Sequence, residues 1–257
     1  MNKIKASIPN AITSMNLFSG CIACVMAFNE NFFWATMFIY LASIFDFFDG
    51  LSARALKVSS PIGKELDSLA DMVSFGLAPG VILYAWLSSL FSRTELFPLV
   101  GEVDLLSRGN QILPYIAFLI SVFSALRLAK FNIDERQTSS FIGLPTPANS
   151  IFIASLISLA DMSATSNPML NFLSEKVAAL CGSVVFIIVL IILFSWLLVS
   201  EIPMFSLKVK NLRWADNKIR FIFLILSVLM TILLWWGAAP LIILLFILMS
   251  ILTGRKS

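Results

Sequence analysis

The sequence predicts an all-α protein that is embedded in a membrane. Of its 257 residues, 59% are hydrophobic and 13% are charged, and the mean hydropathy is +0.93. Soluble domains contain about 45 to 50% apolar and about 25% charged residues. The apolar residues here form runs close to the ~20 residues that a helix needs to cross a bilayer. We therefore expect a single polytopic membrane domain over residues 1–257, without a soluble domain.

The apolar runs divide the chain into about eight predicted helical spans. Pro9 and Asn10 precede the first run, where they are expected to begin its helix. The fifth run is short, and only residues 237–239 separate the last two, so seven spans or a re-entrant segment are also compatible. The predicted ranges are 11–28, 32–48, 69–91, 112–130, 148–161, 177–200, 220–236 and 240–252.

The basic residues are distributed unevenly between the two sides of these spans. With the N-terminus inside and an even number of spans, fifteen of the 18 Lys and Arg residues fall on the cytoplasmic side. The exceptions are Arg93, Arg108 and Lys176. Because short cytoplasmic loops carry such an excess, we expect the N-terminus, and the aspartates described below, to face the cytoplasm.

The absence of histidine limits the chemistry that the chain can perform. It excludes histidine-based triads, histidine-ligated zinc and histidine general bases. Cys21 and Cys24 form a C-x-x-C pattern inside an apolar run, so packing or lipid contact is expected for them and for Cys181, rather than metal or redox work. Chemistry is left to carboxylates, Lys, Arg, Ser, Thr and Tyr.

Four aspartates lie close together in the segment 46–71. Asp46 and Asp49 are three residues apart. Asp67 and Asp71 are four apart, so each pair shares one face of a helix. Charged groups at the edge of a membrane helix are costly unless they are paired, hydrated or bound to a cation. Converging carboxylates without histidine favour a hard cation, Mg²⁺ or Mn²⁺, as the partner.

Small residues and an arginine accompany the aspartates. Gly50 and Ala53 continue the face that carries the second aspartate, and Gly63 stands one turn before the third. Their small size leaves room for a substrate beside the backbone, and Arg54 offers a planar group suited to phosphate. Solvation or pairing with a neighbouring lysine is the alternative for any single aspartate, but it does not explain the whole set.

These residues resemble a known family signature. The matching pattern is Asp46-x-x-Asp49-Gly50-x-x-Ala53-Arg54, eight residues, then Gly63-x-x-x-Asp67-x-x-x-Asp71, which is similar without a departure to that of the CDP-alcohol phosphatidyltransferases. The resemblance implies a helical membrane bundle in which the first three aspartates bind one or two divalent metals. It implies that Asp71 is the general base and also contributes to the metal site. Gly50, Arg54 and Ser60 are implied to contact the diphosphate or nucleotide of the donor.

Two flanking regions resemble one branch of this family, the membrane-spanning phosphatidylserine synthases of bacteria and archaea. They are PNAITSMNLFSG at 9–20, and RLAKFN at 127–132 with FIGLPTPA at 141–148. With these segments the resemblance covers residues 8–150. It implies transfer of a phosphatidyl group from CDP-diacylglycerol to L-serine with release of CMP, by a homodimer in a bacterial or archaeal inner membrane.

The flanking regions add candidate binding residues. Asn10, Thr13 and Asn16 are expected near the nucleotide, with helix capping as the alternative for Asn10. Arg127 is expected to face the cleft and bind an acceptor carboxylate or phosphate, and Asn132 adds a neutral donor and acceptor. A role as a membrane-surface anchor is the alternative for Arg127. So few basic groups suit serine better than a phosphorylated acceptor with a dianionic group.

Two alternatives to serine transfer stay open. One is the same chemistry with another acceptor, glycerol 3-phosphate or an inositol compound. The other is cation transport, because carboxylates within a membrane also mark ion pathways. The four aspartates gather near one face of the membrane instead of tracing a path across it, which favours the enzyme. The expected partners are CDP-diacylglycerol, L-serine and the lipid bilayer, with no nucleic acid.

Overall fold

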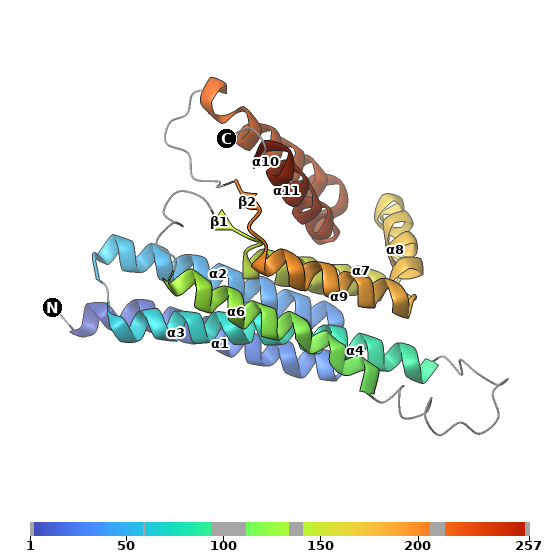
Figure 1. Cartoon of the computed structure of the whole chain (residues 1–257). Coiled ribbons are helices and arrows are strands. Elements are labelled where there is room, and N and C mark those ends of the chain that lie inside the picture. Colours follow the sequence, from blue (N-terminus) through green and yellow to red (C-terminus); the bar gives the residue numbers. More distant parts are fainter. Residues whose placement is uncertain (1–2, 59, 94–111, 134–140, 206–213, 255–257) are drawn as a thin grey trace.

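The chain folds almost entirely into helices, as the computed structural model shows for residues 3–58, 60–93, 112–133, 141–205 and 214–254 (Figure 1). The predicted all-α class is therefore confirmed for the described residues. The elements in chain order are α1 (Lys3–Phe28), α2 (Phe32–Leu56), α3 (Pro61–Asp71), the π-helix η1 (Met72–Leu77), α4 (Ala78–Arg93), the 3-10 helix η2 (Leu113–Phe118), α6 (Leu119–Ile133), β1 (Phe141–Ile142), α7 (Thr146–Ala160), α8 (Pro168–Cys181), α9 (Val184–Val199), β2 (Pro203–Met204), α10 (Trp214–Leu234), the 3-10 helix η3 (Trp235–Ala238) and α11 (Ala239–Gly254).

Most of the helices form one elongated bundle. Helices α1 to α4, α6, α7 and α9 run along a common direction, whereas α10 and α11 contact each other and lie at an angle to the bundle (Figure 1). Helix α8 is bent by 91° relative to α9. The short strands β1 and β2 pair antiparallel, with Phe141 opposite Met204, and so join the start of α7 to the end of α9.

Five helical runs of the described residues are long and apolar enough to cross a membrane, or six if the bent pair α8 and α9 counts as one span. The predicted count of about eight is not confirmed. Helix α7 has only 15 residues, and the predicted span 177–200 is divided by the bend after Cys181. The last two predicted spans fall within one candidate, Asn217–Thr253, in which Trp235 adopts a φ of 52° where α10 meets η3. Several basic residues that determine the expected orientation, Arg108 among them, lie outside the described residues.

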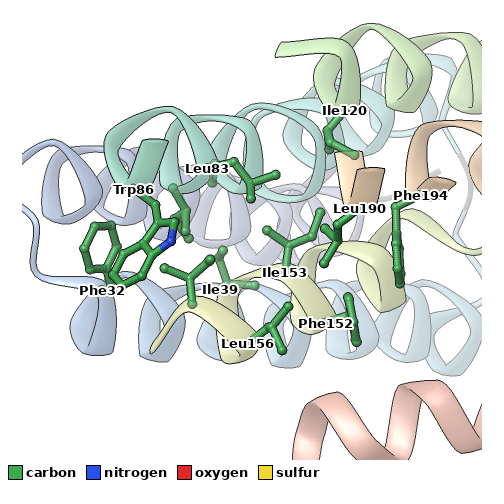
Figure 2. Close-up of a cluster of buried hydrophobic side chains, with 14 of the residues drawn as sticks. Phe32, Ile39, Leu83, Trp86, Ile120, Phe152, Ile153, Leu156, Leu190 and Phe194 are labelled. Carbon is green, nitrogen blue, oxygen red and sulfur yellow. The ribbon is translucent and has the colours of Figure 1, made fainter. Parts of the chain in front are cut away.

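The centre of the bundle core is formed by apolar side chains from α2, α4, α6, α7 and α9, and other helices add further apolar side chains (Figure 2). The rings of Phe32 and Trp86 meet edge to face, with centroids 5.4 Å apart. Phe152 and Phe194 stack face to face at 4.3 Å. Because lipid tails are as apolar as these side chains, close packing contributes more to helix association here than the exclusion of water.

Helix α1 begins before the position that the sequence predicts. It starts at Lys3, so Pro9 lies inside the helix, and the prediction that Pro9 and Asn10 begin it was wrong. Proline lacks the amide that would bond to the carbonyl of residue 5, so the helix passes through Pro9 with one backbone hydrogen bond fewer. The hydroxyls of Thr13 and Ser14 donate to the carbonyls of Pro9 and Asn10 at 3.0 and 2.8 Å, further along the same helix.

Candidate active site and family

The aspartates of the signature lie in the second half of α2 and in α3, the helix that follows it. Asp46 and Asp49 belong to α2, and Asp67 belongs to α3. One carboxylate oxygen from each of these three residues lies within 4.8 Å of those of the other two. Asp49 is buried and the other two are half-buried. The structure thus brings together three of the four carboxylates whose spacing predicted a common site.

Asp71, the fourth aspartate, is the last residue of α3 and lies one turn beyond Asp67. It is not part of the group of three, although its charge interacts with theirs. Its Oδ1 accepts a hydrogen bond of 3.2 Å from Nδ2 of Asn16. It also interacts electrostatically with Arg127 of α6. Asp71 is therefore coupled both to the carboxylate group and to α6.

Helix α1 contacts two of these aspartates. The hydroxyl of Thr13 donates to Oδ2 of Asp49 at 2.8 Å, and Asn16 bonds to Asp71. Both α1 side chains are buried. The structure shows that both side chains hold carboxylates in place, while their predicted position near the nucleotide stays a prediction. Hydrogen bonds of this kind fix the orientation of potential metal ligands.

A pocket of about 250 Å³ lies beside the carboxylates. The predicted residues Thr13, Gly50, Ala53, Ser60 and Gly63 all line it. The complete lining is Pro9, Asn10, Thr13, Asp49, Gly50, Ala53, Val58, Ser60, Gly63, Lys64 and Asp67. Sequence reasoning placed Asn10 near the nucleotide, but it did not assign Pro9, Val58 or Lys64 to the site. Of these, Lys64 directly follows the signature residue Gly63, so its place in the sequence could have indicated that it lies at the site.

The two signature glycines leave space that a larger residue would fill. A Cβ at Gly63 would stand 2.9 Å from Oδ1 of Asn10 and from Oγ of Ser60. A Cβ at Gly50 would stand 3.3 Å from Nη1 of Arg54, so the guanidinium lies across this glycine. Arg54 is therefore next to the pocket through Gly50, although it is not one of the lining residues.

The N-terminus of α3 forms part of the pocket wall. Ser60 is its N-cap, and the serine hydroxyl accepts a hydrogen bond of 3.0 Å from the Gly63 amide. The first amides of a helix carry partial positive charge and favour anions. The part of the pocket wall formed by the start of α3 therefore offers Lys64 and a helix N-terminus to an anionic group.

Arg127 and Asn132 of α6 do not line this pocket. Arg127 is buried, its Nη1 lies 3.5 Å from the Thr146 hydroxyl, and its guanidinium stands 5.7 Å from the Phe131 ring centroid. Nδ2 of Asn132 donates to the Ser68 hydroxyl at 3.0 Å, which joins the end of α6 to α3. The structure thus gives Asn132 a packing contact, while Arg127 is the α6 group coupled to Asp71.

A π-helix follows Asp71 directly and was not predicted. It covers Met72–Leu77, between α3 and α4. The hydroxyl of Ser74 in this segment donates to the carbonyl of Asn16 at 3.0 Å, and its own carbonyl accepts from the Ser150 hydroxyl at 3.4 Å. Single π segments inside α-helices are frequent at functional sites. This one ties the backbone after Asp71 to both α1 and α7.

Comparison with known sequences identifies the family. The model of the CDP-alcohol phosphatidyltransferase family matches residues 6–254 of the chain. The chain belongs to the CDP-alcohol phosphatidyltransferase family. Members of this family are metal-dependent, and the group formed by Asp46, Asp49 and Asp67 is compatible with a divalent cation.

Curated relatives within this family carry a more specific name, CDP-diacylglycerol-serine O-phosphatidyltransferase. A relative from Bacillus subtilis is 34% identical over 163 residues, 63% of this chain and 78% of that protein. One from Helicobacter pylori strain J99 is 33% identical over 147 residues, 56% of this chain and 54% of the relative. One from Methanocaldococcus jannaschii is 33% identical over 153 residues, 60% of this chain and 61% of the relative. The matched region therefore spans less than two thirds of the last two relatives.

Proposed function

We propose that the protein transfers the phosphatidyl group of CDP-diacylglycerol to L-serine, forming phosphatidylserine and releasing CMP. The observation that carries this proposal is the group of three carboxylates beside a pocket lined by small signature residues. The choice of L-serine as the acceptor rests on the names of the relatives. The apolar helices support an integral membrane enzyme, and the excess of basic residues supports an active site that faces the cytoplasm.

The carboxylate group fits a hard divalent cation. Its donors are all oxygen atoms, as Mg²⁺ and Mn²⁺ prefer, and three anionic side chains within 4.8 Å repel one another without a cation. Asp46, Asp49 and Asp67 would hold the metal, with Asp71 as a further ligand. A bound Mg²⁺ or Mn²⁺ would neutralise charge on the diphosphate of the donor.

The pocket suits the head group of CDP-diacylglycerol. Gly50, Ala53 and Gly63 let the nucleotide and diphosphate approach the backbone. Arg54, Lys64 and the capped N-terminus of α3 would offset the charge of the phosphates. The acyl chains would stay in the bilayer, where the exposed apolar faces of the helices meet lipid.

Asp71 would accept the proton of the acceptor hydroxyl. The hydroxyl oxygen of serine forms a bond to the phosphorus that bears diacylglycerol. The bond between this phosphorus and the oxygen bridging to the CMP phosphate breaks, and CMP leaves with the electron pair. A carboxylate is a weak base toward an alcohol, so we expect the proton to move as the new bond forms rather than before it.

A release assay tests this function. Purified protein in detergent is given CDP-diacylglycerol, Mg²⁺ or Mn²⁺, and one of L-serine, glycerol 3-phosphate or inositol, and CMP is measured. We expect CMP to form only when L-serine is the acceptor, and no CMP to form after chelation of the metal. CMP formed with another alcohol would reject serine as the acceptor. No metal-dependent release with any alcohol would reject the transferase and favour cation transport.

The family resemblance also leads us to propose a homodimer, without a nucleic-acid partner. Light scattering of the detergent-solubilised protein, corrected for bound detergent, measures the protein mass directly. A mass of twice 28.5 kDa is expected. A mass equal to one chain would reject the dimer.

A further inference from the structure

Polar side chains are buried where α6 meets the start of α7. We call this set the α6/α7 cluster; it comprises Ser124, Arg127, Thr146, Asn149 and Ser150. Each member is more than nine-tenths buried, and none lines the pocket beside the carboxylates. The cluster is thus separate from the pocket of α1, α2 and α3, yet it contains the arginine that interacts with Asp71.

Several polar atoms of the cluster have no protein partner. Within the described residues, neither Oδ1 nor Nδ2 of Asn149 forms a hydrogen bond, although this side chain is fully buried. Nε of Arg127 and Oγ of Ser124 also have no partner there. Buried polar groups are nearly always hydrogen-bonded, because an unpaired one keeps the full penalty of its lost hydration. These unpaired groups lie on two helices that Arg127 and Thr146 bring into contact, and they indicate a ligand that satisfies them.

The start of α7 is bonded to η1, which follows Asp71, and to the end of α9. Thr146 and Asn149 are three residues apart and share a face of α7, and Thr146 contacts Arg127. On the same helix, the Ser150 hydroxyl donates to the carbonyl of Ser74, three residues after Asp71. Before the helix, the amide of Leu144 donates to the carbonyl of Leu197 at 2.9 Å. These bonds leave little freedom for Asn149 to move away.

The chemistry of the cluster fits a carboxylate. A guanidinium, a primary amide and hydroxyls can together donate to both oxygens of one carboxylate. Arg127 supplies one positive charge, which matches a monoanion better than a dianionic phosphate. In serine only two carbon atoms separate the hydroxyl oxygen from the carboxylate carbon, so the group that binds the carboxylate and the base that accepts the hydroxyl proton must lie close together, and Arg127 is the basic residue that interacts electrostatically with Asp71.

We propose that Asn149 and Thr146 complete, with Arg127, a site for the carboxylate of the acceptor, and that Asn149 makes the enzyme prefer an amino acid to an acceptor without a carboxylate. This inference rests on the proposed function. It assigns the pocket of α1 to α3 to the donor and the α6/α7 cluster to the acceptor, with Asp71 coupled to both.

Steady-state kinetics of single variants test the assignment. Asn149→Ala and the similarly sized, apolar Asn149→Leu are compared with the wild type for CMP release. We expect the KM for L-serine to rise about tenfold or more, with the KM for CDP-diacylglycerol changed less than twofold. Ser158→Ala is the matched control, because Ser158 is buried on the same helix and its hydroxyl also has no partner among the described residues. We expect it to behave as the wild type.

A second readout separates recognition of the carboxylate from a packing defect. Serinol has the hydroxyl and amine of serine but no carboxylate, so the ratio of kcat/KM for L-serine to that for serinol measures the preference directly. We expect Asn149→Ala to lower this ratio about tenfold, whereas a packing defect would slow both acceptors equally. If Asn149 variants fail to fold, Thr146→Val, which keeps the size of the residue, carries the same test.

The outcomes distinguish this inference from the proposed function. An active wild type whose folded Asn149 and Thr146 variants keep their KM for serine, and their preference over serinol, would overturn the inference alone. The same shift in Ser158→Ala would overturn it too. A wild type that releases no CMP with serine would instead reject the function on which the inference rests.

Discussion

Thr13 stands outside the family signature but touches one of its aspartates. Its hydroxyl donates to Oδ2 of Asp49 at 2.8 Å, and both side chains are buried. Thr13→Val keeps the shape and removes the donor, so Asp49 is held less well for binding a cation. Partners of metal ligands typically contribute 10- to 100-fold to metal affinity or activity. We expect the Mg²⁺ or Mn²⁺ concentration for half-maximal CMP release to rise about tenfold in this variant.

Thr13→Ser provides the control for that titration. Serine retains the hydroxyl, so its metal dependence should stay within about threefold of the wild type. Identical metal titrations for Thr13→Val and the wild type would show that the hydrogen bond to Asp49 does not support metal binding.

The carboxylate of Asp71 is the second residue-scale prediction. Asp71→Asn keeps the size and the ability to bond to Asn16, but it removes the proton acceptor. General bases typically contribute about 10²- to 10⁴-fold, so transfer to serine should fall at least 100-fold. A melting curve in detergent should stay close to that of the wild type. Near-normal turnover in this variant would reject Asp71 as the base.

At the scale of elements, α1 and η1 approach each other closely at Gly20. A Cβ at this position would lie 2.7 Å from Cα of Ser74, so backbone rather than a flexible side chain would have to move. Overpacking of this kind costs about 1 to 3 kcal/mol. Gly20→Val should therefore lower the melting temperature, and it should lower kcat because it shifts Asn16, one turn earlier on α1, relative to Asp71. Melting curves and CMP release measure the two effects.

Cys21→Val is the matched control for Gly20→Val. Cys21 is the next residue of α1 and is exposed, so added bulk there meets lipid instead of η1. A melting temperature that falls equally in both variants would show that the close approach of Ser74 is not the reason why position 20 needs a small residue.

The helices that carry the signature could be predicted because their information is local. The spacing of three and four residues within 46–71 placed each pair of aspartates on one helix face, and the structure brings Asp46, Asp49 and Asp67 together. The features that were missed depend on packing between distant segments. The π-helix after Asp71, for example, bonds to α1 and α7.

Single residues show the same division between local and distant information. Ser60 was assigned to substrate contact from its position six residues after Arg54 in the sequence, and it lines the pocket. It also caps α3, which a serine directly before a proline could have indicated. Asn149 gave no signal in the sequence, because a lone asparagine in an apolar run is informative only when its burial and its partners are known. The bend between α8 and α9 likewise left no pattern beyond Gly182 and Ser183.

At the scale of the whole molecule, the carboxylates and their pocket lie near one end of the bundle, where α2 ends and α3 begins. CDP-diacylglycerol in the inner leaflet and L-serine in the cytosol can reach this end of the bundle only if it faces the cytoplasm. The opposite end of α2 adjoins the turn at Asn29 and Glu30. Because α2 is a helix of 25 residues, about 37 Å at 1.5 Å per residue, it is long enough to place these two ends on opposite sides of a bilayer.

Labelling of single cysteines tests this orientation. The three native cysteines are first replaced by alanine, and one cysteine is then introduced as Asn29→Cys or Ala55→Cys; both positions are exposed and adjoin opposite ends of α2. In intact cells a membrane-impermeant maleimide should label the Asn29 variant and leave the Ala55 variant unlabelled until the membrane is permeabilised. The reverse pattern would place the carboxylates outside the cytoplasm and would show that the excess of basic residues does not set the topology of this chain.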